Sequence, residues 1–385
     1  MEVNILTRDF HPDYSAVANK LTDLAEDLTL QDVKVTVYAG RPYYYFHGEF
    51  KEKNITNLSV NRVWSTRFGK DNLLSRFVDE MSFAASIFLK RVFGRRELNV
   101  IPSLPFSLQL TAIILKKLRS QEYIIINYEL MPELLYSSGI LSDKGFVYRF
   151  LDKMAITVLR GAKSAVAVSG NMRDRLEKKS GRKVFLLPPW ADNEKIFPLE
   201  KKENKLLAEL KLSESFVVSY SGNFGRYMDF DTVLDAVEKL GEARFLFIGN
   251  GAQKKNICSR KGVLYSDYLP RERLNESLNS GDLSLVLTND GDEDFVLPSK
   301  VFELMACGKP VLAVAGSDSE VSTLIRKADC GFIVKPGGTQ GFVDAVSKLM
   351  GDRDELGRLG ENGRRYLLKN FTRSKVTKKF IDFIR

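Results

Sequence analysis

The sequence has little cysteine and histidine, and it contains no long apolar run. Its three cysteines, Cys258, Cys307 and Cys330, are odd in number and lack metal-like spacing, which favours a reduced, cytosolic protein over a disulfide-bonded one. With only two histidines, His11 and His47, a zinc site or a Ser–His hydrolase triad is poorly supplied. No window reaches the roughly 18 apolar residues of a membrane span. The N-terminal sequence MEVNILTRDF predicts a strand rather than a signal peptide.

Positive charge is in excess and unevenly distributed. The chain has 58 Lys and Arg against 49 Asp and Glu, a net charge of +9. Seven basic residues but a single acid, Glu97, lie between Lys90 and Arg119, where they flank apolar segments at residues 82–89 and 104–115. This pattern suits a peripheral surface on anionic lipid, such as the inner face of the cell membrane, where each basic residue adds about 1 kcal/mol. It equally suits core-facing helices with solvated ends. The cluster lacks the interleaved aromatics typical of nucleic-acid binding.

Strand-like and helix-like patterns alternate along nearly all of the 385 residues. Such alternation is typical of parallel, doubly wound sheets, and the length favours two domains. A segment rich in proline and charge, residues 188–205, interrupts the alternation. We therefore predict an α/β fold with two Rossmann-like doubly wound domains that face each other across a cleft. The expected boundaries are 1–188 and 189–370, and a C-terminal helix at 371–385 is expected to pack back on the first domain.

The segment Leu297–Ala313, LPSKVFELMACGKPVLA, is the most informative part of the chain. It predicts a loop, a short helix that Ser299 caps and Gly308 ends, and then a buried strand. Lys300 and Glu303 lie in the first turn of that helix. Because a helix N-terminus attracts phosphate and a carboxylate can accept hydrogen bonds from a ribose diol, the segment indicates a nucleoside-diphosphate site.

The strand that opens the second domain runs into the loop SGNFGR. Gly222 and Gly225 permit a close backbone approach to a ligand, Asn223 can hydrogen-bond to it, and Arg226 supplies a positive fork for a diphosphate. The alternative is a tight turn with a surface arginine. Both this loop and the helix at Lys300 are expected just past strand carboxyl ends, where open α/β sheets bind ligands.

Two later loops extend the candidate donor site. The sequence IGNGAQKK contains Gly249-x-Gly251 but has Lys254 where the dinucleotide fingerprint requires a third glycine, which argues against a dehydrogenase. Asn250 of this loop is a candidate donor contact. Tyr268 and Leu269 are candidates for a wall against a nucleobase, and the alternative is an ordinary turn before the next helix.

Loops of the first domain offer fewer signals. His11 and Tyr14 follow the first strand and are candidate acceptor contacts, and His11 is alternatively a cap for the next helix. Glu129 or Glu133, after another strand, is a candidate to meet a hydroxyl. The alternative for both is an acid at a helix N-terminus. The acidic loop at residues 290–295 could hold a divalent ion, but we favour a solvated or sugar-facing loop and expect no metal.

These segments resemble the retaining glycosyltransferases of family four, which have the GT-B fold. Within that family the chain is most similar to bacterial O-antigen and capsule enzymes that transfer amino sugars such as N-acetylfucosamine. The similarity covers almost the whole chain and is most specific in the LPSK-to-KPVLA block. The weaker motifs follow in family order: YSGNFG, LPPWAD, IGNGAQKK, YLPRERL and ADCGFIVKPGG.

The resemblance implies that Glu303 is the second glutamate of the family's E-x7-E motif and binds the donor ribose. It also implies that Ser299, Lys300 and Val301 begin the helix that cradles the diphosphate, and that Arg226 contacts phosphate. The chain departs from the family pattern in two places. Phe295 stands where the family has the first glutamate of the motif, and Glu293 or Asp294 could take over the role of that glutamate. Tyr128 stands where the family frequently has a histidine.

Together the residues and the resemblance predict a metal-independent, cofactor-free transferase. It would move a sugar, with retention, from a nucleoside diphosphate, expected to be uridine diphosphate (UDP), to a hydroxyl of a polyprenyl-diphosphate-linked saccharide in cell-surface polysaccharide synthesis. Arg226, Lys300 and Glu129 are the expected catalytic residues. Two alternatives are a sugar-nucleotide 2-epimerase of the same fold and a degenerate, non-catalytic subunit of a glycan-assembly complex.

Overall fold

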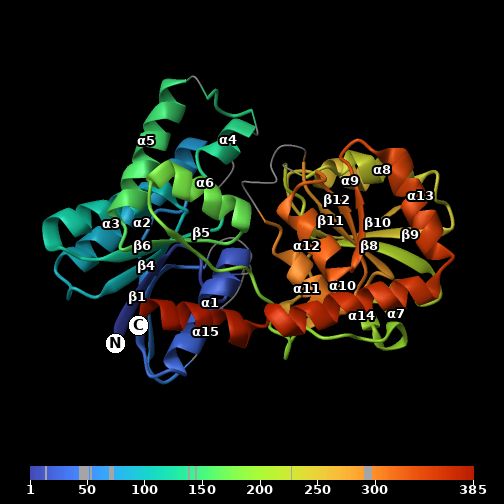
Figure 1. Ribbon diagram of the computed structural model, residues 1–385, viewed down its shortest axis with the longest axis horizontal. Helices are drawn as coiled ribbons and strands as arrows, with labels where there is room; N and C mark the ends of the chain where they lie inside the picture. The colour runs from blue at the N-terminus through green and yellow to red at the C-terminus, as the bar shows by residue number, and fades with distance from the viewer. Residues whose placement is uncertain are drawn as a thin grey trace. The chain divides into compact units, whose positions relative to one another are not determined.

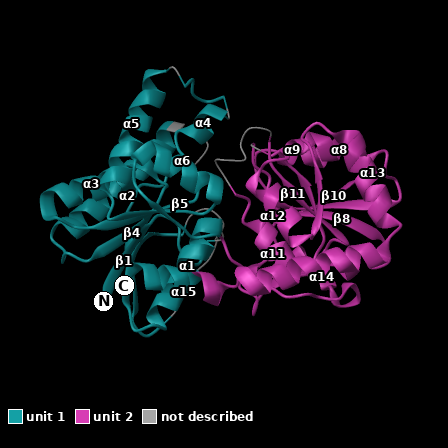
Figure 2. Cartoon of the chain, in the orientation of Figure 1, with its two compact units in different colours: residues 1–188, 377–385 teal, residues 189–376 magenta. Residues whose placement is uncertain are grey.

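In the computed structural model the chain forms two compact units. Unit 1 comprises residues 1–188 and 377–385, and unit 2 comprises residues 189–376 (Figure 2). The structure describes residues 1–13, 15–42, 52, 54–68, 73–137, 139–143, 145–226, 228–289 and 297–385. The predicted contributions of Tyr14, His47 and the acidic loop at 290–295 lie outside these residues.

Unit 1 is built on a parallel sheet of seven strands (Figure 1). Its strands are β1 Glu2–Thr7, β2 Lys34–Gly40, β3 Leu58–Val63, β4 Leu98–Pro102, β5 Tyr123–Asn127, β6 Ser164–Ala167 and β7 Val184–Leu186. The interior strand β5, YIIIN, is buried at every position, as expected for a strand covered on both faces. β4 was not singled out from the sequence because its apolar residues, Leu98, Val100 and Ile101, are too few to show a period.

Helices cover both faces of this sheet (Figure 1). They are α1 Ala16–Thr29, α2 Leu73–Val92, α3 Phe106–Arg119, α4 Glu133–Ser137, α5 Phe146–Gly161, α6 Gly170–Ser180 and, at the end of the chain, α15 Arg373–Ile384. The Ser15 side chain caps α1 by accepting from the amide of Ala18, so the alternative role of His11 as the helix cap is wrong. The final turns of α15 complete unit 1: Phe383 stacks on Phe185 with ring centroids 4.0 Å apart.

Unit 2 is built on a parallel sheet of six strands. Its strands are β8 Phe216–Asn223, β9 Ala243–Asn250, β10 Val263–Ser266, β11 Leu283–Leu287, β12 Val311–Val314 and β13 Gly331–Val334. Its helices are η1 Lys201–Glu203, α7 Lys205–Glu209, α8 Asp231–Val237, α9 Lys254–Ser259, η2 Arg271–Arg273, α10 Leu274–Leu278, α11 Lys300–Ala306, α12 Glu320–Ala328, α13 Thr339–Met350 and α14 Arg353–Asn370. Separate apolar cores lie on the two faces, one against α8 and α13 and one against α11, α12 and α14.

Strand order identifies where each unit can bind a ligand. Unit 1 has the order β3-β2-β1-β4-β5-β6-β7, and unit 2 has the order β10-β9-β8-β11-β12-β13. Both orders reverse direction once, between β1 and β4 and between β8 and β11. In open parallel sheets ligands bind beyond the carboxyl ends of the strands at such a switch point. The predicted fold class, two Rossmann-like doubly wound domains, is confirmed.

Candidate functional site

The loops that leave β8 and β9 pack against each other without room for side chains. Parallel pairing places Gly222 beside Gly249 and Asn223 beside Asn250. Gly249 has φ +145°, and a Cβ there would lie 1.8 Å from the carbonyl oxygen of Gly222. Gly251 likewise faces the backbone of the β8 loop, because a Cβ there would lie 2.6 Å from the carbonyl oxygen of Phe224. The Gly-x-Gly pair therefore serves close loop packing.

Lys300, the first residue of α11, reaches the β8 loop. A Cβ placed at Gly222 would lie 2.7 Å from both Cε and Nζ of Lys300. Burial lowers the pKa of Lys300 below its ordinary value, and the nearby Glu303 carboxylate partly opposes this shift. Lys300 forms no ion pair with any carboxylate among the described residues. The unit 2 switch point thus contains a partly desolvated cation that forms no ion pair with a carboxylate of the described residues.

The start of α11 differs in detail from the prediction. Ser299 adopts helical backbone angles and its side chain accepts no capping bond, because the chain enters α11 through a turn in which the amides of Val301 and Phe302 donate to Pro298 and Ser299. The predicted cap is therefore wrong. The Val301 side chain is fully buried in the core, which leaves only its backbone near the helix start. Glu303 lies in the first turn, as predicted.

Arg226 lies on the same loop as Gly222 and Gly225. Its side chain is exposed and has no hydrogen bond or ion pair to a described residue. Asn223 is exposed as well, and its carbonyl accepts from the Tyr220 hydroxyl at 2.8 Å. The structure thus brings Gly222 and Lys300 into contact, and it leaves Arg226 and Asn223 accessible on the connected loop.

The other predicted donor contacts border the β9 loop. The side chain of Asn250 is engaged within the protein, because Nδ2 donates to Asp267 at 2.9 Å and Oδ1 accepts from the Gly251 amide at 2.8 Å. Tyr268 is 42% exposed, and its hydroxyl lies 3.5 Å from the Asn250 carbonyl. Leu269 packs against a small core cluster instead. Of these three, Tyr268 presents the largest accessible face.

Sequence reasoning missed the aromatic cluster beneath the β8 loop. Tyr220, Phe224, Phe230 and Phe247 are buried and meet edge to face or tilted, with the Tyr220 and Phe230 centroids 5.1 Å apart. The Tyr220 hydroxyl also lies 3.0 Å from Sδ of Met228, which ties the end of the loop to its start. The density of aromatic residues in YSGNFGRYMDF was the available signal.

Two predicted residues of unit 1 that the structure describes, His11 and Glu129, have different surroundings. The backbone of His11 bonds to Thr22 and Arg62. Glu129 lines a cavity of about 20 Å³, room for about one water molecule, together with Asn127 and Lys179. Burial raises the pKa of the Glu129 carboxyl above its ordinary value.

Glu133 lies in the first turn of α4, where its carboxylate pairs with Lys179 at 2.7 Å. This ion pair agrees with the structural alternative for Glu133, an acid at a helix N-terminus, rather than with a hydroxyl contact.

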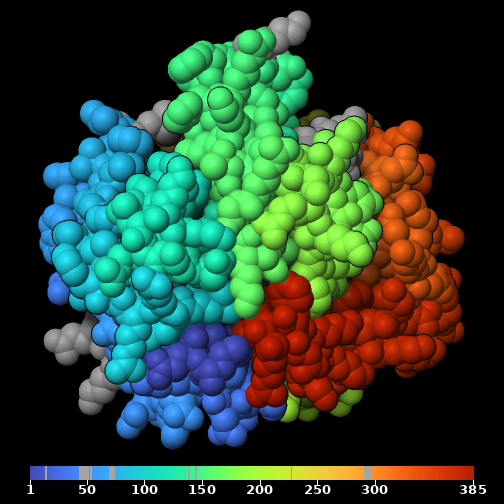
Figure 3. Space-filling view, turned by 60° about the vertical axis from the view of Figure 1, so that its left-hand side comes forward, coloured from blue at the N-terminus to red at the C-terminus, as the bar shows by residue number. Residues whose placement is uncertain are grey.

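Helices α2 and α3 pack side by side (Figure 3, blue to cyan). Both present apolar residues to solvent. The exposed apolar side chains at helical spacing are Leu74, Phe77, Val78, Met81 and Leu89 on α2, and Leu110, Ile114 and Leu118 on α3. We call these eight residues the α2–α3 face. Exposed Lys90, Arg95, Arg96 and Lys117 flank it. Arg91 does not contribute to this charge, since it is 2% exposed and pairs with Glu97 at 3.3 Å.

Among the helices that the structure describes, none has the length and apolarity needed to cross a bilayer. The described residues contain no cluster of three His, Cys, Asp or Glu side chains suited to a metal. The acidic loop at 290–295 is not among these residues.

Sequence comparison relates the chain to enzymes of glycosyl transfer. Residues 202–366 match the family model described as "Glycosyl transferases group 1". WbjE of Pseudomonas aeruginosa, named as a probable glycosyltransferase, is 25% identical over 83% of this chain and 82% of its own length. WcaI of Escherichia coli K12, whose name assigns it to glycosyl transfer in colanic acid biosynthesis, is 21% identical over the full length of both chains.

Solved structures show the same fold. Sucrose-phosphate synthase of Thermosynechococcus elongatus superposes with a TM-score of 0.82 at 14% identity, over 100% of this chain and 98% of that one. HepE of Anabaena, solved in complex with UDP-glucose, superposes with a TM-score of 0.74 at 13% identity, over 99% of both chains.

Proposed function

We propose that this GT-B chain, whose residues 202–366 match the glycosyl transferases group 1 model, transfers a sugar from a nucleoside diphosphate to a saccharide acceptor. One observation is the main support: the ammonium of Lys300 lies against Gly222 at the unit 2 switch point, partly desolvated and without an ion pair to a described carboxylate. Desolvating a cation is costly unless an anion joins it. A diphosphate supplies that anion.

The donor in this proposal is a UDP-sugar, the ligand class present in the HepE complex. Lys300 pairs with the diphosphate, and Arg226 adds a second positive group from the β8 loop. Glu303, one turn into α11, accepts the ribose hydroxyls. Gly222 and Gly225 allow the backbone to approach the phosphates, Tyr268 lies against the base, and the sequence resemblance suggests an amino sugar of the N-acetylfucosamine type.

Catalysis in this proposal is largely electrostatic. Negative charge develops on the leaving diphosphate as the glycosidic bond breaks, and preorganised donors stabilise that charge. Lys300 and Arg226 fill this role, and no metal or cofactor is required. We propose retention at the anomeric carbon, with a phosphate oxygen accepting the proton of the attacking hydroxyl.

We assign acceptor binding to unit 1 and propose a lipid-linked saccharide acceptor, as expected for cell-surface polysaccharide synthesis. His11, Tyr14 and Glu129 follow strands of the unit 1 sheet and remain the proposed contacts. The raised pKa of Glu129 suits a carboxyl that exchanges a proton with a hydroxyl.

The α2–α3 face supports a peripheral position on an anionic membrane. When a helix is apolar on its outward side as well as its buried side, the outward side favours contact with lipid or another apolar surface. The flanking basic residues favour anionic headgroups. We expect vesicles containing phosphatidylglycerol to sediment the protein at low salt and to release it at high salt. Phe77→Asp should weaken sedimentation, whereas Leu30→Asp, at an exposed residue directly after α1, should not. Equal sedimentation of both variants would refute this surface.

The enzymatic proposal is tested with purified protein, a panel of nucleotide sugars and a lipid-linked saccharide extract. Transfer of label to the lipid fraction, lost in Lys300→Ala, is the expected result. Release of a free epimerised sugar nucleotide would support the epimerase alternative instead. Nucleotide binding without turnover on any acceptor would support a non-catalytic subunit.

A further inference from the structure

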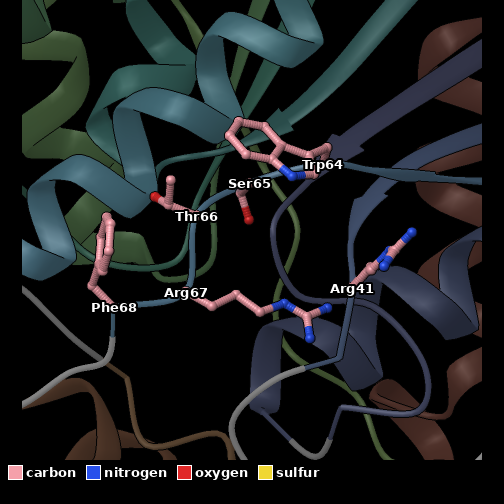
Figure 4. A pocket seen from close by; sticks show the side chains of 6 residues that line it. All are labelled: Arg41, Trp64, Ser65, Thr66, Arg67 and Phe68. Carbon is pink, nitrogen blue, oxygen red and sulfur yellow. The ribbon is translucent and has the colours of Figure 1, made fainter.

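A pocket of unit 1 that no motif indicated lies at the carboxyl ends of β2 and β3. It encloses about 390 Å³ and is lined by Arg41, Trp64, Ser65, Thr66, Arg67 and Phe68 (Figure 4). Arg41 follows β2 directly and Trp64 follows β3 directly. Because β2 and β3 pair in parallel, with Gly40 beside Val63, the two side chains begin from neighbouring points on one sheet edge.

The loop that forms this pocket is held firmly to α2. The Thr66 hydroxyl donates to the carboxylate of Asp79 at 2.7 Å, and the Phe68 amide donates to the same carboxylate at 3.1 Å. The Thr66 amide donates to Ser82 at 2.9 Å. The Asp79 carboxylate is 1% exposed, and its hydrogen bonds to the loop offset the cost of burying it. Such anchoring preorganises the side chains that the loop presents.

Those side chains combine two cations with an exposed aromatic ring. In Figure 4 the guanidinium of Arg67 extends toward Arg41, and the Trp64 indole borders the same space. Trp64 is 62% exposed. Guanidinium groups bind phosphate through paired hydrogen bonds, and an indole face packs against the apolar face of a sugar ring.

Phe68 of the pocket lining is anchored to α2, the helix that carries five residues of the α2–α3 face. Its ring is 68% exposed, and its amide donates to Asp79 at 3.1 Å. Leu74, Phe77 and Met81 are exposed on the same helix. In a ligand whose phosphate joins a sugar to a hydrocarbon chain, the phosphate and sugar match the pocket, and the chain matches the exposed apolar residues of α2.

We infer that Arg41 and Arg67 bind the phosphate of a lipid-linked saccharide acceptor, that Trp64 covers its first sugar, and that its hydrocarbon chain lies along α2. This inference rests on the proposed function, because it assigns the acceptor of that reaction. The pocket is formed by residues of unit 1, whereas the proposed nucleotide site is formed by residues of unit 2.

The two tryptophans of the chain make the inference measurable. Trp64 is exposed in the pocket, whereas Trp190 is 2% exposed in unit 2. Farnesyl diphosphate is the probe, with farnesol and inorganic diphosphate as its separate halves. We expect a saturable change in tryptophan emission with farnesyl diphosphate, weaker binding of either half, and no signal in Trp64→Phe.

Arg41→Ala and Arg67→Ala should each raise the Kd by about 10- to 100-fold, the range for one charge-assisted hydrogen-bonding partner. Arg244→Ala removes an exposed arginine of β9 and should leave binding unchanged. Circular dichroism verifies folding, and Arg41→Gln and Arg67→Gln replace any alanine variant that does not fold.

Unchanged affinity in both arginine variants would overturn the inference. So would equal binding of farnesol, competition by UDP, or an identical emission change with phosphatidylglycerol vesicles that also depends on Arg67, since the last result identifies a bilayer headgroup as the ligand. Thermal stabilisation by UDP is measured in parallel. Its absence would count against the nucleotide site alone and leave the pocket result interpretable.

Discussion

Replacing Lys300 with methionine separates ligand binding from folding. Methionine keeps the length and apolar stem of the side chain but removes the ammonium that lies against Gly222. In the unliganded protein that ammonium is desolvated, which lowers its pKa. A lysine with a lowered folded-state pKa destabilises the fold at every pH below that pKa, and stability recovers as the pH rises toward 10.5. At neutral pH, Lys300→Met should therefore unfold at an equal or higher urea concentration than wild type.

Ligand binding should change in the opposite direction. UDP at 100 times its Kd stabilises a folded protein by about 2.7 kcal/mol, which raises the melting temperature of a unit of this size by about 5–10 °C. Removing one charge-assisted partner of a diphosphate costs about 1.5–3 kcal/mol, or a factor of about 10 to 100 in Kd. At the same UDP concentration the shift in Lys300→Met should thus fall to about 1–5 °C.

Lys309→Met is the matched control, because burial also lowers the pKa of Lys309, on the turn after α11. It should tolerate methionine and retain the full UDP shift. The reasoning fails if Lys300→Met lowers stability without ligand and keeps the wild-type response to UDP, because Lys300 would then be a structural residue.

Three further changes test other parts of the structure. UDP affinity should fall as the pH rises through the lowered pKa of Lys300, below 10.5, and Lys300→Arg should retain affinity there; calorimetry across alkaline pH measures both. Gly249→Ala should destabilise by at least about 1–3 kcal/mol in urea, because its Cβ meets the Gly222 carbonyl at 1.8 Å, whereas Gly241→Ala has open space and should be neutral. The pKa of Glu129 is raised in the folded state, so wild-type protein should lose stability as the pH rises above 4.5. Glu129→Gln should not show this loss. Urea midpoints that depend on pH in the same way in both proteins would exclude this role of Glu129.

The sequence predicted the repeating pattern of the fold better than its details. Strands Tyr123–Asn127 and Gly331–Val334 have the bounds that their apolar runs indicated. Capping was predicted less well: Ser299 has the right residue type, but the turn before α11 uses backbone bonds instead. Local sequence does not determine whether an amide at a helix start donates to a serine side chain or to a backbone carbonyl.

For the candidate sites too, the sequence predicted the positions along the fold better than the local contacts. Lys300 and Gly222 were predicted as neighbours from their places after strands of one sheet, which is a consequence of topology. The desolvation of Lys300 was not predictable, because it depends on how closely two distant segments approach. Arg41, Trp64 and Arg67 were missed since no motif links them, and only the pairing of β2 with β3 places them together. Arg91 was counted with the surface charge, but tertiary packing buries it beside Glu97.

The return of α15 to unit 1 has a consequence for biosynthesis. Unit 1 consists of residues 1–188 and 377–385, so all of unit 2 is translated before the last part of unit 1 leaves the ribosome. Until then Phe185 has no stacking partner, and the surface that later covers Phe380 and Ile381 stays open to water. Since domains fold as they emerge, unit 2 should reach its native state while unit 1 is still unfinished. A chain truncated before residue 377 should have a folded unit 2 and an incomplete unit 1 with exposed apolar residues. Such an incomplete unit is a substrate for chaperones and proteases.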